Sequence, residues 1–238
     1  MRLVLFDIDG TLILTRGAGM RAFYRAMRHA FDITVDSEVI CPDGKTDPLI
    51  AKELLAYFGQ GDRWNEKSRD ALFSSYLSCL EEEMSRARES GSIRILPGVT
   101  LLLDGLISQP DFALGLVTGN LEEGARIKLE KAGLDSYFRF GGYGSDSEDR
   151  TALIRVGIRR GAQLVAPAPV EDSFVIGDTP LDVIHGHAAG ACVIAVASAK
   201  YSVDDLCPHG PDLLVPDLTQ VDSIISFMRM WPDRLWPS

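Results

Sequence analysis

The chain has 238 residues, of which 46% are hydrophobic, so it can bury one core plus a smaller second module without disulfides. Its formal net charge of -10 disfavours binding to nucleic acid, which requires a basic surface, and favours a small-molecule substrate instead. The first apolar run is too short for a signal peptide, and no stretch approaches the roughly 18 apolar residues that span a bilayer, so we expect a soluble cytoplasmic protein with no membrane contact.

The first predicted element is a short strand, the apolar run 3–6, which is followed at once by Asp7-Ile8-Asp9-Gly10. An apolar run without polar alternation is typical of a parallel strand buried on both faces, and ligands bind at the carboxyl ends of such strands. Because two carboxylates beside a buried strand are costly unless a cation or hydrogen bonds compensate them, we expect a hard metal ion such as Mg²⁺ nearby. The alternative is that Asp7 and Asp9 only begin a turn, since Asp-Gly is a common turn pair.

Residues 15–92 contain apolar side chains at helical spacing and no convincing strand. The expected helices cover 20–31, 47–58 and 62–89. We therefore interpret residues 15–92 as a helical cap domain, inserted after the first strand of a core domain that comprises 1–14 and 93–238.

Strands and helices alternate after residue 93. The expected strands are 112–117, 137–142, 174–176, 191–196 and an edge strand at 213–215. The expected helices are 99–108, 121–132, 151–163, 180–189 and 218–230. This alternation predicts the α/β class, with a Rossmann-like parallel sheet and right-handed crossovers.

Polar groups follow two of these later strands. The strand that begins at residue 112 ends in Thr118-Gly119-Asn120, where a hydroxyl and exposed backbone N–H groups suit a phosphate oxygen. An ordinary helix cap by Thr118 or Asn120 is the alternative. The strand 174–176 ends in Gly177-Asp178, and Asp182 follows four residues later on the same side of a helix. Asp182 could instead be a first-turn acid favoured by the helix dipole.

Together these three strand ends resemble the motifs of the haloacid dehalogenase superfamily, in the expected order. The resemblance implies that Asp7 is a nucleophile, that Asp9 is a general acid and base, and that Thr118 hydrogen-bonds the transferring phosphoryl group. It also implies that Mg²⁺ is held by Asp7, Asp178 and the backbone carbonyl of Asp9, with Asp182 supporting the metal's waters or the neighbouring loop.

The third motif departs from the family, which usually places a Lys near the start of the next helix. Residues 141–151 contain no Lys, and Arg150 occupies the matching position. A guanidinium can carry the same charge with a different hydrogen-bond geometry. The alternative is that Arg150 pairs with acids on the surface. Lys128 and Lys131, on the helix after the second motif, are expected to face solvent.

The predicted cap contains Gly44-Lys45-Thr46-Asp47, which resembles a Gly-x-Thr-Asp stretch of phosphoglycolate-phosphatase-like members. This resemblance places Lys45 and Thr46 beside the substrate, with Gly119 and Asn120 on the core side. Lys45 could equally be an exposed loop lysine.

These features favour a Mg²⁺-dependent phosphatase that acts on a small phosphorylated metabolite through an aspartyl-phosphate. Asp9 argues against haloacid dehalogenases and phosphonate hydrolases, which resemble this fold but lack that acid. Two alternatives stay open: a phosphomutase of the β-phosphoglucomutase type, and a non-catalytic relative that binds a phosphorylated ligand. A monomer and a homodimer are both compatible with the sequence.

Overall fold

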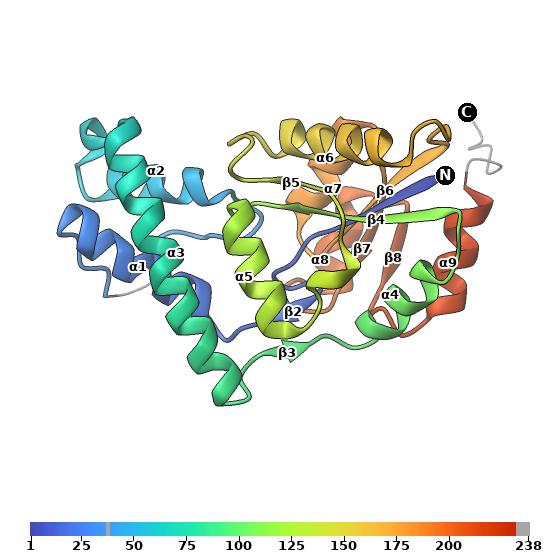
Figure 1. Cartoon of the computed structure of the whole chain (residues 1–238), viewed down its shortest axis with the longest axis horizontal. Coiled ribbons are helices and arrows are strands. Elements are labelled where there is room, and N and C mark those ends of the chain that lie inside the picture. Colours follow the sequence, from blue (N-terminus) through green and yellow to red (C-terminus); the bar gives the residue numbers. More distant parts are fainter. Residues whose placement is uncertain (37–38, 232–238) are drawn as a thin grey trace.

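A parallel sheet forms the centre of the computed structural model, which describes residues 1–36 and 39–231 (Figure 1). Its strand order is β5-β4-β1-β6-β7-β8, and every neighbouring pair is parallel. The strands are β1 (Arg2–Phe6), β4 (Phe112–Thr118), β5 (Gly141–Tyr143), β6 (Asp172–Gly177), β7 (Cys192–Val196) and β8 (Leu213–Val215). The predicted α/β class with a Rossmann-like sheet is confirmed.

The pairing register brings the polar strand ends to one edge. Phe6, the last residue of β1, pairs with Leu116 of β4 and with Ile176 of β6. Asp7 therefore follows β1 at the level where β4 ends in Thr118 and where β6 leads into Asp178. Parallel strands in register share a carboxyl edge, which explains why the side chains at these three ends meet.

Helices cover both faces of this sheet. On one face α4 (Val99–Ile107), α5 (Glu122–Ala132) and α9 (Val221–Met230) enclose one apolar cluster, and on the other α6 (Arg150–Val165), α7 (Pro180–Ala189) and α8 (Val203–Leu206) enclose a second. The side chains of β1 alternate between the clusters, with Val4 and Phe6 in the first and Leu3 and Leu5 in the second. The prediction that β1 is buried on both faces is confirmed.

A third apolar cluster lies among α1 (Ala18–Phe31), α2 (Asp47–Tyr57) and α3 (Glu66–Glu89), at the left of Figure 1. Phe23 and Tyr76 join α1 to α3, with their ring centroids 4.8 Å apart. Leu121 and Ile127, next to and within α5, belong to the same cluster, so these helices pack on the core. The division of the chain into a core and a cap stays a prediction.

Two linkers connect this helical group to the sheet. They pair as a short antiparallel ladder of β2 (Ile13–Leu14) and β3 (Arg94–Ile95). Strands of two residues are too short to give a period-two pattern, which is why the sequence did not indicate them.

Some predicted boundaries are wrong. The strand expected at 137–142 is reduced to β5, and a 3-10 turn precedes it at Asp135–Tyr137. The helix expected at 62–89 is divided into a 3-10 turn at Gly61–Arg63 and α3, because Asn65 and Ser68 form a capping box that starts a new helix. Residues 37–38 and 232–238, which belong to the predicted cap and core ranges, lie outside the described residues.

Candidate active site

Three buried carboxylates meet at the carboxyl edge of the sheet. One oxygen from each of Asp7, Asp178 and Asp182 lies within 4.8 Å of the others. The Thr11 hydroxyl donates to Asp178 Oδ1 at 2.9 Å. Gly10 allows this approach, because its φ is +86° and a Cβ there would lie 2.2 Å from Asp178 Oδ2. The glycine after Asp9 is therefore required by packing as well as by the turn.

Burial of these acids makes their charged forms costly. Burial raises the pKa of Asp7 to about 7, against the opposing effect of Arg150, and the charges of Asp182 and Asp9 add to the rise. Burial, followed by the charges of Asp182 and Asp7, holds the pKa of Asp178 well above its usual range. A divalent cation would compensate this excess of negative charge, and carboxylate oxygens are the ligands that Mg²⁺ prefers. Asp7 and Asp178 therefore fit the expected metal.

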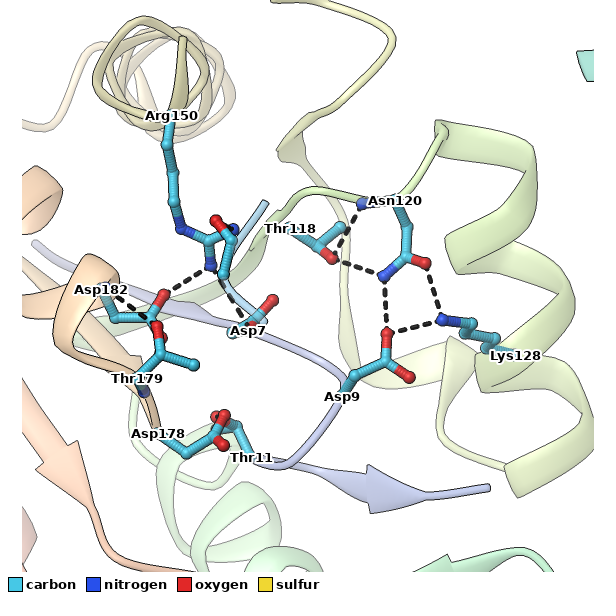
Figure 2. A network of polar contacts seen from close by, with 11 residues as sticks. Asp7, Asp9, Thr11, Thr118, Asn120, Lys128, Arg150, Asp178, Thr179 and Asp182 are labelled. Atoms are coloured by element: carbon cyan, nitrogen blue, oxygen red, sulfur yellow. Dashed lines mark hydrogen bonds and ion pairs between the residues drawn. The ribbon is translucent and has the colours of Figure 1, made fainter. Parts of the chain in front are cut away.

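Arg150 lies inside this cluster and is 4% exposed. Its Nη2 donates to Asp182 Oδ1 at 2.5 Å and lies 3.4 Å from Asp7 Oδ2, while Nη1 donates to the backbone oxygen of Gly44 at 3.2 Å (Figure 2). Burial lowers the pKa of Arg150, but the carboxylates of Asp182 and Asp7 outweigh it and raise that pKa, so the guanidinium stays charged. Since the side chain is buried, the alternative of a surface ion pair is wrong.

Asp182 has a double structural role. Its Oδ2 accepts hydrogen bonds from the Thr179 backbone N–H at 3.0 Å and from the Thr179 hydroxyl at 2.7 Å, which completes a capping box at the start of α7. Its other oxygen holds Arg150. Asp182 is thus a first-turn acid, as one reading of the sequence proposed, and it also orients the guanidinium beside Asp7.

Asp9 belongs to a second hydrogen-bond network, which is separate from the cluster of Asp7, Asp178 and Asp182 (Figure 2). Its Oδ2 accepts from Lys128 Nζ at 2.5 Å and from Asn120 Nδ2 at 2.9 Å. Asn120 also donates to the Thr118 hydroxyl at 2.7 Å, and its Oδ1 accepts from Lys128 Nζ at 2.7 Å. The Asp9 side chain therefore does not join the acidic cluster. That its backbone carbonyl faces the metal stays a prediction.

The expectation that Lys128 faces solvent is wrong. The Lys128 side chain is only 5% exposed, because it lies on the side of α5 that faces Asp9. The first turn of α1 is also close, since a Cβ at Gly19 would lie 3.3 Å from Lys128 Nζ. The sequence did contain a signal: Lys128 falls on the same helical stripe as Leu121 and Ala125. Lys131 is partly buried and forms an ion pair with Glu81 of α3.

The loop before α2 rests on the loop after β4. The Asp47 N–H donates to the Gly119 carbonyl at 2.8 Å, and the Asp47 carboxylate accepts from the Leu121 N–H at 2.9 Å. A Cβ at Gly119 would lie 2.0 Å from the Lys45 carbonyl oxygen, so only glycine permits this contact. Burial raises the pKa of Asp47 to about 6, although Lys128 opposes the shift. The sequence did not indicate this role for Asp47.

A cavity of about 480 Å³ connects the two networks. Most of the predicted site residues line it: Asp7, Asp9, Lys45, Thr118, Gly119, Asn120, Arg150 and Asp178. Lys45 forms an ion pair with Glu53 at 2.6 Å. Two predicted residues do not line it: Asp182 lies behind Arg150, and the buried Thr46 hydroxyl accepts from the Leu49 N–H at the start of α2.

The sequence profile of the haloacid dehalogenase-like hydrolases matches residues 4–196. The chain belongs to this family. Pyrophosphatase PpaX of Listeria welshimeri is 24% identical over 232 residues, which cover 93% of this chain and 95% of the relative. The chain is also similar in structure to a β-phosphoglucomutase from Clostridium difficile (TM-score 0.71, 17% identity, 98% and 99% of the two chains) and to a predicted phosphatase from Clostridium acetobutylicum (TM-score 0.68, 20%, 95% and 98%).

Membership of this family confirms the prediction of a hydrolase of the haloacid dehalogenase type. Among the described residues, no helix is both long enough and apolar enough to cross a membrane.

Proposed function

We propose that the protein is a Mg²⁺-dependent phosphatase that hydrolyses a small phosphorylated metabolite. One observation carries the proposal: Asp7 and Asp9 are only two residues apart in the chain, yet their carboxylates lie in different environments. Asp7 lies in a buried cluster beside Arg150 and Asp178, whereas Asp9 is 45% exposed and is held by Lys128 and Asn120. Pairs of acids in contrasting environments are what nucleophile and proton-transfer roles require.

In the proposed first step, a carboxylate oxygen of Asp7 attacks phosphorus in line while the ester O–P bond breaks. The leaving alkoxide takes a proton from Asp9, and an aspartyl-phosphate forms on Asp7. In the second step Asp9 removes a proton from water, which attacks phosphorus while the bond between phosphorus and the Asp7 oxygen breaks. This releases inorganic phosphate and restores the Asp7 carboxylate. Mg²⁺, held by Asp7 and Asp178, would supply positive charge that offsets the phosphoryl oxygens.

Thr118 and Arg150 are proposed to hold the phosphoryl group. The Thr118 oxygen accepts from the Asn120 side chain at 2.7 Å and from the Asn120 backbone N–H at 3.3 Å. Its own O–H is consequently available to donate to a phosphoryl oxygen. Arg150 brings a fixed positive charge to within 3.4 Å of Asp7, where it would offset the negative charge of the nucleophile and of the phosphoryl oxygens that it attacks.

The helices α1–α3 would cover the site during turnover. The carbonyl of Gly44 accepts from Arg150, and Asp47 is bonded to the loop 119–121. Closure of this kind excludes bulk water and brings the substrate-selecting side chains to the site.

Two other activities are worth separate assays. The name of the Listeria relative makes inorganic pyrophosphate a candidate substrate, and the mutase alternative predicts isomerisation of a sugar phosphate. The test is a phosphate-release screen with Mg²⁺ over phosphomonoesters, pyrophosphate and an aryl phosphate, with the Asp7→Asn protein as the control. Phosphate release by the wild type alone supports the proposal. Isomerisation without release would favour the mutase, and no turnover of any compound would favour the non-catalytic relative.

A further inference from the structure

Basic side chains gather around the cavity although the whole chain is acidic. Six basic residues line it against five acidic ones, in a chain whose net charge is -10. The basic residues are Arg16, Lys45, Arg94, Lys128, Arg150 and Lys200. A cavity lined in this way attracts anions although the protein as a whole is negative, so we expect its ligand to be negatively charged.

Four of these six cations already have acidic partners. Lys45 pairs with Glu53, Lys128 with Asp9, Arg150 with Asp7 and Asp182, and Lys200 with Asp43. In contrast, the side chains of Arg16 and Arg94 form no hydrogen bond or ion pair with any residue that the structure describes. Among the basic residues that line the cavity, these two arginines are therefore the ones whose positive charge is not balanced by an acidic side chain of the described residues.

The two arginines are neighbours on the linkers. Arg94 pairs with Leu14 in the β2–β3 ladder, and Arg16 follows Leu14 by two residues. Figure 1 shows this ladder and α6, which carries Arg150, on opposite sides of strand β4. The linker arginines therefore come from a different part of the fold than the guanidinium that faces Asp7.

The backbone around Arg16 is held in an uncommon conformation. Its φ is +48°, in the left-handed region that non-glycine residues rarely adopt. Arg21 stabilises it, because Nη1 of Arg21 donates to the Arg16 carbonyl at 2.6 Å while Nε is bonded to the buried Glu83 at 2.9 Å. Strained residues of this kind cluster at ligand-binding sites.

The helix that follows adds further donors. Its N-cap, Gly17, has no side-chain cap, and the first turn of α1 contains no acid. Gly17, Gly19 and Met20 of this turn line the cavity together with Arg16. The free N–H groups and the dipole of a first turn favour a negative group, which adds to the effect of the arginines.

We infer that Arg16 and Arg94, with the first turn of α1, form a subsite for a second anionic group of the substrate. The inference rests on the proposed function and narrows it: the substrate is a phosphate ester that carries a carboxylate or a second phosphoryl group at its other end. A guanidinium matches both groups because it can donate two parallel hydrogen bonds. A cavity of about 480 Å³ restricts the substrate to a small metabolite.

The test compares matched substrates. We would measure kcat/KM for phosphate esters of ω-hydroxycarboxylic acids with a chain of two to six carbons, and for the primary amides of the same esters. α,ω-Bisphosphates of the same lengths and inorganic pyrophosphate distinguish a second phosphoryl group from a carboxylate. The proteins are the wild type, Arg16→Gln, Arg94→Gln and, as the matched control, Arg28→Gln, which removes an exposed arginine of α1 that does not line the cavity.

At the fitting chain length the wild type should prefer the anionic compound to its uncharged match by about tenfold or more, as expected for a charge-assisted hydrogen bond. Arg16→Gln and Arg94→Gln should remove most of that preference, and Arg28→Gln should keep it. Equal rates on acids, bisphosphates and amides by the wild type would overturn the subsite while leaving the phosphatase intact. An equal loss on all compounds in the arginine variants would also overturn it. No phosphate release from any compound, including an aryl phosphate, would overturn the proposed function and the subsite together.

Discussion

Replacement of Lys128 by Met would test whether the network around Asp9 contributes to turnover. The change removes the ammonium that donates to Asp9 at 2.5 Å and to Asn120 at 2.7 Å, and it keeps most of the volume of the buried stem. A hydrogen bond to a charged group contributes about 1.5–3 kcal/mol. Because the Asp9 side chain is 45% exposed, water compensates part of the loss, so we expect the lower end of that range.

A loss of about 1.5–2 kcal/mol corresponds to a fall in kcat/KM of roughly 10- to 30-fold. The fall should depend on the leaving group, since Lys128 acts through Asp9, and only poor leaving groups need the proton that Asp9 supplies. Alkyl phosphates should therefore be affected more than an aryl phosphate. The assay is phosphate release with Mg²⁺ on one compound of each kind.

Lys131→Met is the matched control, because Lys131 lies on the same helix but pairs with Glu81 of α3. It should change kcat/KM by no more than about twofold, under 1 kcal/mol. The double variant Asp9→Asn, Lys128→Met should be no slower than Asp9→Asn alone, because both changes affect one proton transfer. A Lys128→Met protein with near wild-type rates, or with the same loss on alkyl and aryl phosphates, would refute the reasoning.

Three further predictions concern the acidic cluster. Asp7→Asn should abolish phosphate release without lowering the thermal unfolding temperature below that of the wild type, because the amide keeps the shape of the side chain and carries no buried charge. Substantial residual turnover would remove Asp7 from the nucleophile role. Arg150→Ala should lower kcat/KM by roughly a hundredfold or more, as for loss of one preorganised donor. Arg150→Lys should recover part of that loss. If Arg150→Ala stays within about threefold of the wild-type rate, under 1 kcal/mol, Arg150 has no role beside Asp7. Without metal, the pKa of Asp7 is raised from 3.8 to about 7, so the folded protein holds this proton more tightly than the unfolded chain does. The free energy of unfolding should therefore fall as the pH rises from about 4 through 7. Since Mg²⁺ needs the ionised carboxylates, it should raise the unfolding temperature more at pH 8 than at pH 5.5, and an equal effect at both values in calorimetry would count against Asp7 as a ligand.

The groups that follow strands could be located from the sequence. An unbroken apolar run precedes each of Asp7, Thr118 and Asp178. Because parallel strands in register end at the same edge of the sheet, these three residues must lie close together. The resemblance to the haloacid dehalogenase motifs also placed Arg150 near them, although only the structure excludes the surface alternative, through the burial of Arg150 and its contact with Asp7.

Contacts between distant elements could not be located in this way. Lysines on helices usually are exposed, which predicts a solvent-facing Lys128, and nothing in the sequence indicates its partner Asp9, which is 119 residues away. Asp47 is expected to start a helix within the Gly-x-Thr-Asp stretch, but its contacts with Gly119 and Leu121 depend on how α2 rests on the core. The alternation of strands and helices predicts a strand at 137–142, but Phe138 lies in the segment before β5, where its ring packs on Phe6 with the centroids 5.9 Å apart.

The two positive groups that contact Asp7 and Asp9 come from helices that follow different strands, and each can therefore serve a different carboxylate. Arg150, at the start of α6, reaches Asp7, and Lys128, in the second turn of α5, reaches Asp9. On the proposed function, the charge that the family usually places at one position is here supplied at two, one beside the nucleophile and one beside the acid and base. Arg150→Ala should then slow alkyl and aryl phosphates alike, because both pass through attack by Asp7. Lys128→Met should slow chiefly the alkyl esters, so the leaving group separates the two residues even where the losses are of similar size.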